Sequence, residues 1–200
     1  IKKVKGGLYK MKLQTTNPQT TFSPVMALQT AAWATFTAVV IIAVAAWSRD
    51  LGWHFNNLST YQLFPLFGLL AFSIMWSHYM ANVLRLVFNQ KMSVLSRYYR
   101  STSFAVLALI CLHPALLIFQ RFRDGFGLPP GSYESYVAPG LGWITLLGTA
   151  SFFVFIAFEF RRKLGGRSWW KYVARASDFA MLAIFYHGLR LGSNLIGGWF

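Results

Sequence analysis

The chain has 200 residues and a net charge of +14, yet only 12% of its residues are charged while 56% are hydrophobic. Soluble domains carry about 25% charged residues, so this composition excludes an ordinary soluble protein and indicates a membrane protein. The basic residues lie in blocks between long apolar runs, which leaves no basic soluble module for nucleic acid. The single cysteine, Cys111, excludes an intrachain disulfide and a multi-cysteine metal site.

The chain begins with a polar, lysine-rich arm, residues 1–25, which we expect on the cytoplasmic membrane surface. Apolar runs follow that are close to the roughly 20 residues a spanning helix needs. They cover residues 26–47, 64–87, 101–119, 140–158 and 172–191. The sequence therefore predicts an all-α integral membrane protein with a bundle of five transmembrane helices. Residues 194–200 can open a sixth, so we expect the chain to be part of a longer polypeptide.

The distribution of basic residues predicts the orientation of the bundle. Lys and Arg are enriched in cytoplasmic loops. With the N-terminus inside, fifteen of the nineteen Lys and Arg lie on the cytoplasmic side, in the arm, in residues 85–100 and in residues 161–175. The opposite orientation reverses this ratio, so we predict a cytoplasmic N-terminus.

Two histidines lie at a similar depth in the predicted bundle. His113 comes six residues before the end of the third span and His187 four before the end of the fifth, and both spans run from inside to outside. At 1.5 Å per residue, both lie about 6–9 Å below the outer end of the apolar zone. Facing imidazoles at one level can be the two axial ligands of a b-type haem iron, and Arg190, three residues after His187, can pair with a haem propionate. The alternative is that both histidines form hydrogen bonds between helices.

A third histidine, His78, lies in the inner half of the second span, too deep to share an iron with the other two. Asn82 and Arg85 follow at positions i+4 and i+7, so the three residues form a polar stripe on one helix face. One interpretation is that His78 contacts an inner cofactor, which can be a second haem, a flavin or a quinone. The other is an ordinary polar contact between helices.

The basic loop and the fifth span resemble the ferric-reductase-like transmembrane domain family. The residues that carry the resemblance are 161–165 (RRKLG), then Trp170, then the run to His187. The third span, with Arg100 before an apolar run that reaches His113, is similar to the haem-ligating third span of that family. The resemblance covers about residues 60–193, and this family includes the haem-binding subunits of bacterial methionine sulfoxide reductases, NADPH oxidases and six-transmembrane metalloreductases.

The resemblance implies that residues 26–200 form a haem-binding domain, which in the family has six spans. Aligned on Trp170 and Arg175, the outer ligand of the family falls on His187 and the inner one on Ala174. Alanine cannot ligate iron, so we expect one haem b, in the outer leaflet. Metalloreductases of the family hold a flavin at the inner position, which implies FAD or FMN there.

Two functional hypotheses follow. The first is a transmembrane electron-transfer protein that passes electrons from a cytoplasmic flavin/NAD(P)H donor, either a separate reductase or a missing domain, to an acceptor on the outer side. It would be an oxidoreductase component, which we expect in the bacterial cytoplasmic membrane. The second is a structural or assembly subunit that keeps the fold but has lost the haem.

Overall fold

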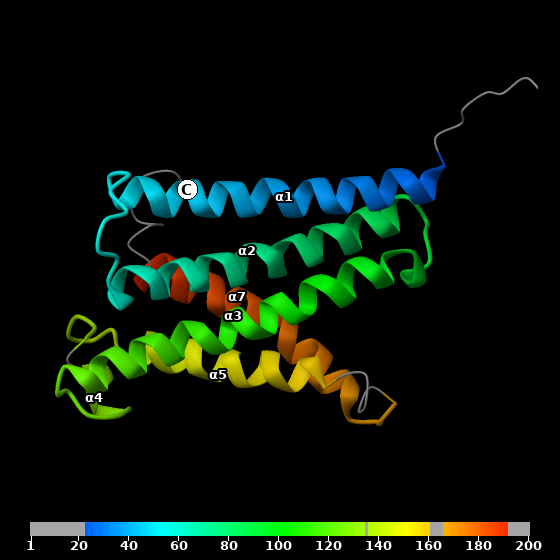
Figure 1. The fold of residues 1–200 in the computed structure, drawn as a ribbon. Coiled ribbons are helices and arrows are strands. Elements are labelled where there is room, and N and C mark those ends of the chain that lie inside the picture. Colours follow the sequence, from blue (N-terminus) through cyan, green and yellow to red (C-terminus); the bar gives the residue numbers. More distant parts are fainter. Residues whose placement is uncertain (1–22, 135, 161–165, 192–200) are drawn as a thin grey trace, which may run out of the picture.

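The computed structural model describes residues 23–134, 136–160 and 166–191, which form helices and turns with no β-strand among them (Figure 1). The elements are α1 (Pro24–Asp50), α2 (Thr60–Val87), the 3₁₀ helix η1 (Met92–Leu95), α3 (Ser96–Arg123), α4 (Gly131–Glu134), α5 (Gly142–Glu159) and α7 (Trp170–Leu191). Most of the predicted N-terminal arm, the basic run 161–165 and the possible sixth span lie outside the described residues.

Every predicted apolar run corresponds to a helix, and most of these helices extend beyond the run. α3 continues for several polar residues on both sides of residues 101–119. α2 begins four residues before its apolar run, because the backbone N–H of Ser59 donates to Gln62 Oε1 at 2.8 Å and so satisfies one of the free donors at the helix start. The short helix α4 lies in a Gly/Pro-rich loop in which the sequence predicted no element.

Among the residues that the structure describes, three segments are long and apolar enough to cross a membrane: α1, α2, and η1 together with α3. The apolar part of α5, Gly142–Phe158, is shorter. α7 has 22 residues, and the charged Arg175, Asp178 and Arg190 lower its mean hydropathy. Three candidate spans indicate a multi-pass membrane protein whose apolar helices suit a lipid bilayer.

The helices pack in two groups. α1, α2 and α3 lie side by side in alternating directions, while α5 and α7 pack on each other and meet the first group mainly through α3 and α2 (Figure 1). Small residues line the buried surfaces, as expected where close backbone approach, and not exclusion from water, drives helix association. The buried small residues include Ala32, Ala71, Ser77, Ala81, Ser177 and Ala180.

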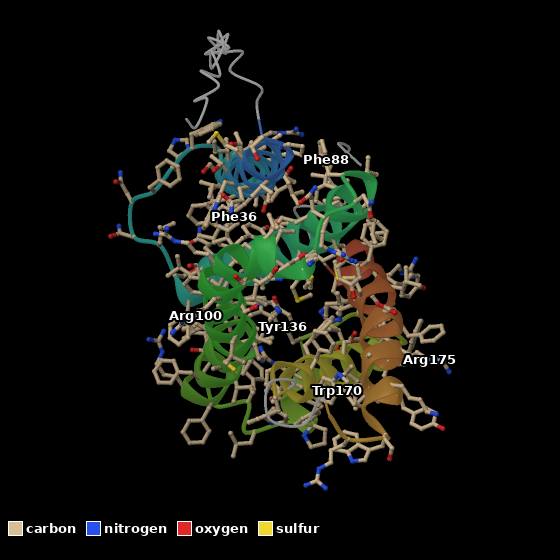
Figure 2. The ribbon with its side chains drawn as sticks, turned by 90° about the vertical axis from the view of Figure 1, so that its right-hand side faces the viewer. Phe36, Phe88, Arg100, Tyr136, Trp170 and Arg175 are labelled. Atoms are coloured by element: carbon tan, nitrogen blue, oxygen red, sulfur yellow. The ribbon has the colours of Figure 1, made fainter. Side chains whose placement is uncertain are left out.

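Two apolar clusters hold the helices together. The first joins α1, α2 and the start of α3 around Leu28, Ala81 and Leu95. The second joins α2, α3, α5 and α7, and Phe36 of α1 packs against both clusters (Figure 2). The second cluster consists of Ile74, Met75, Val106, Phe155 and Ala180. It is the main apolar contact between the two helix groups and lies in the middle of the bundle.

Candidate functional site

His113 is held by the neighbouring helix of its own hairpin. It lies on α3, partly buried, and its Nδ1 is 2.7 Å from the backbone carbonyl oxygen of Phe64 on α2. A carbonyl oxygen only accepts, so Nδ1 carries the proton. In the neutral ring, Nε2 then keeps its lone pair and can bind a metal.

His187 repeats this arrangement in the second hairpin. It lies on α7, partly buried, and its Nδ1 is 2.9 Å from the carbonyl oxygen of Ile144 on α5. The same reasoning places the proton on Nδ1 and the lone pair on Nε2. Each of the two histidines that the sequence paired is thus held by the same kind of bond in its own hairpin.

A glycine makes room for each imidazole. Gly68 and Gly148 each lie four residues after the carbonyl that the histidine contacts. A Cβ atom at Gly68 would lie 2.7 Å from the ring of His113, and one at Gly148 would lie 2.6 Å from the ring of His187. Carbon atoms do not approach this closely, so any other residue forces the histidine to move. The sequence reasoning missed both glycines.

Aromatic rings link His113 to a buried cation near the C-terminal end of α3. The ring of Phe64 lies 5.4 Å from His113, and Tyr136 packs edge-on against Phe64 at 5.9 Å. Arg121 is only 5% exposed, and its guanidinium lies 3.5 Å from the centre of the Phe126 ring. The sequence assigned an anion-binding role to Arg190, which the structure leaves exposed on the last turn of α7. Arg121 follows His113 by two helical turns, and this spacing in the sequence could have identified Arg121 as a second candidate for an anion-binding role.

Two buried polar atoms near this end have no hydrogen-bond partner among the described residues. They are Oε1 of Gln120, on α3 two turns after His113, and Oγ1 of Thr145, next to Ile144. The amide nitrogen of Gln120 donates to Asp124. The hydroxyl of Tyr61, which donates to Asp124 at 2.6 Å, holds the pKa of the Asp124 carboxyl below its usual value, and the amide of Gln120 adds to this effect. Buried polar atoms normally have partners, so the end of the bundle near Gln120 has unused capacity to bind a polar group.

His78 belongs to a separate polar network. Its Nε2 lies 2.6 Å from Oγ1 of Thr102, which donates its own proton to the carbonyl of Tyr98 at 2.8 Å. Nε2 of His78 is therefore the donor. Along α2, His78 is fourteen residues from Phe64, or about 21 Å at 1.5 Å per residue, so it lies far from the His113 ring.

The other two residues of the predicted polar stripe bond to each other. Nε and Nη2 of Arg85 each donate to Oδ1 of Asn82 at 3.0 Å, and Nη1 of Arg85 donates to the carbonyl of Gln90. The stripe thus makes contacts within the protein. A contact of His78 with an inner cofactor stays a prediction.

We predict that Gly68→Ala and Gly148→Ala each destabilise the protein by about 1–3 kcal/mol, because the added methyl group displaces an imidazole from its carbonyl partner. Gly142→Ala is the matched control, since among the described residues no atom outside its own stretch of the chain lies within 4 Å of its Cβ position. Thermal unfolding of the detergent-solubilised protein, followed by circular dichroism, gives the comparison. Equal unfolding midpoints for the Gly68 and Gly142 variants would contradict the prediction.

A double-mutant cycle tests the role of the His78 bond to Thr102. His78→Ala and Thr102→Val should each cost about 0.5–2 kcal/mol, the range for hydrogen bonds between membrane helices. The double variant should cost less than the sum of the two, since either change alone removes the shared bond. Strictly additive costs in the same unfolding assay would show that the bond contributes nothing.

Comparison of the chain with known protein families, with curated proteins and with solved structures finds no match. The resemblance of residues 60–193 to the ferric-reductase-like family therefore stays a prediction that depends on the residues quoted for it.

Proposed function

We propose that the chain is a transmembrane b-type haem protein in which His113 and His187 are the axial ligands of one haem. The observation that carries the proposal is the matched geometry of the two histidines. Each donates Nδ1–H to a backbone carbonyl of its own hairpin, which leaves Nε2 for a metal. Metal-ligating histidines usually make such a bond through their second nitrogen, because it fixes the ring orientation and strengthens the ligand.

The number of ligands favours a porphyrin over a bare metal ion. The described residues contain no group of three or more His, Cys, Asp and Glu side chains that could hold a metal ion. A porphyrin supplies four nitrogen ligands of its own, so two imidazoles complete the coordination of its iron. The unpartnered Oε1 of Gln120 and Oγ1 of Thr145 offer further polar contacts at the outer end.

The propionates of a haem are anions and need cationic partners in a bilayer. We propose Arg190 for this role, as its spacing from His187 predicts, with Arg121 as a second cation. Arg121 is buried, and its guanidinium lies 5.7 Å from the centre of the Tyr136 ring that covers Phe64. The protein would thus orient the haem, exclude water from it and balance its charge.

A haem in this position would supply one-electron chemistry, so we propose an electron-transfer role. The donor would be a cytoplasmic flavin reductase or a flavin/NAD(P)H domain, with FAD or FMN on the inner side near His78. The acceptor would be a molecule or partner subunit on the outer side. Between the two levels lies the apolar cluster that includes Met75 and Phe155, which would keep water out of the path.

The second candidate is a structural or assembly subunit that keeps the fold without haem. The hydrogen bonds from His113 to Phe64 and from His187 to Ile144 favour this candidate, because each bond joins two helices and involves no cofactor. The two candidate functions differ only in whether Nε2, the second nitrogen of each ring, is used. Haem binding requires Nε2 of both histidines, whereas the structural role requires Nδ1 alone.

We expect the purified protein to show a Soret band that disappears in His113→Ala and in His187→Ala, since either change removes an axial ligand. His54→Ala, in an exposed loop, is the matched control and should keep the band. Oxidised and dithionite-reduced spectra measure haem content and ligation. Added imidazole should partly restore the spectrum of either single variant. A wild-type protein without a Soret band, or a band that persists in the double variant, would contradict haem binding.

We further propose that all five long helices span a bacterial cytoplasmic membrane with the N-terminus inside. In a Cys111→Ser background, a cysteine at Asn56 should react with a membrane-impermeant maleimide on intact cells. Cysteines at Lys91 and Ser168 should react only after lysis, because the positive-inside distribution places their loops in the cytoplasm. Labelling of the Ser168 position on intact cells would show that α5 and α7 do not span in this manner.

A further inference from the structure

A groove of about 940 Å³ runs along the outside of the first helix group, far from the two site histidines. One wall is a face of α1, and the other is the segment from η1 into the first turn of α3. Its lining includes Gln29, Thr30, Trp33, Thr37, Ile41 and Arg97. The groove faces the surroundings of the bundle, because Trp33 is 40% exposed and Ile41 is 61% exposed.

The length of the groove matches one leaflet of a bilayer. Gln29 and Ile41 lie at its two ends on α1 and are twelve residues apart, which is about 18 Å along a helix. Half of the hydrocarbon core of a bilayer is about 15 Å. Between these ends, the small side chains of Ala34 and Ala38 line the groove and leave room in it for a ligand. An extended acyl chain fits this length.

A cation lies at the end of the groove that is nearest the start of α1. Arg97 is exposed, and it makes no hydrogen bond or ion pair with another described residue. None of the described residues that line the groove is acidic. A guanidinium at the edge of a bilayer that lacks a partner in the protein is a strong site for a phosphate oxygen.

The walls of the groove are fixed in place. The amide nitrogen of Gln29 donates to the carbonyl of Val94 at 3.1 Å, which ties α1 to η1. The ring of Trp33 packs edge-on against Tyr98 at 5.3 Å, and the hydroxyl of Tyr98 is hydrogen-bonded to Ser77. The groove therefore exists before a ligand enters it.

We infer that this groove binds one acidic phospholipid, with its phosphate at Arg97 and an acyl chain along α1 as far as Ile41. Charge favours this occupant over a second copy of the chain. The chain carries a net charge of +14, and a symmetric dimer through this face would bring two copies of Arg97 together. Basic pockets between membrane helices at the cytoplasmic surface are typical sites for anionic headgroups.

Native mass spectrometry of the detergent-solubilised full chain tests the inference, with dioleoylphosphatidylglycerol as probe and dioleoylphosphatidylcholine for comparison. Arg97→Gln should lower retention of phosphatidylglycerol about fivefold, the effect of about 1 kcal/mol per basic residue. Arg100→Gln is the matched control, because it removes the same charge three residues away and is not among the residues that line the groove.

A second pair of variants tests the acyl-chain part of the groove. Ala34→Trp fills the groove and should release the bound lipid, while Ala45→Trp, exposed on α1 but outside the groove, should not. Equal retention by the Arg97 and Arg100 variants, equal retention of the two lipids, or loss of a dimer in Ala34→Trp would each overturn the inference. None of these measurements depends on haem, so the result is independent of the proposed function.

Discussion

The candidate site depends on one constraint, which is that polar groups buried among apolar helices need partners within the protein. The imidazoles of His113 and His187 meet it in the same way, each by donating to a carbonyl of the adjacent helix. These bonds require close contact between the two helices of a hairpin, and Gly68 and Gly148 provide it. This one requirement accounts for the ring orientation and the tautomer of each imidazole and for the glycine that lies against it.

The two ends of the bundle differ in how fully their polar groups are used. Towards the end that holds His78, this histidine bonds to Thr102 and the hydroxyl of Tyr98 is paired with Ser77, so the network is closed within the protein. Towards the opposite end, buried oxygen atoms of Gln120 and Thr145 have no partner among the described residues. A ligand with polar groups therefore gains more by binding at that opposite end, where the haem is proposed.

Hydropathy predicted the existence of the long helices, because an apolar run of spanning length has few other structures available in a membrane. It did not predict their ends, since capping at Ser59 and polar turns in α3 extend the helices past the apolar runs. Counting residues along parallel spans led to the prediction that the two histidines act as a pair. It could not predict the glycines, because their role depends on how two helices face each other. Their signal was present in the sequence as two similar segments, 64–68 (FPLFG) and 144–148 (ITLLG).

The division of the helices into two groups has a consequence for biogenesis. Each hairpin supplies one of the two histidines, and the hairpins meet mainly through one apolar cluster, in which Val106 contributes from α3 and Phe155 from α5. A prosthetic group ligated from both sides would act as a cross-link that adds its binding free energy to the association of the hairpins. Cofactor supply would then control how much mature protein accumulates, because chains that lack it would keep two loosely joined halves and be open to membrane proteolysis.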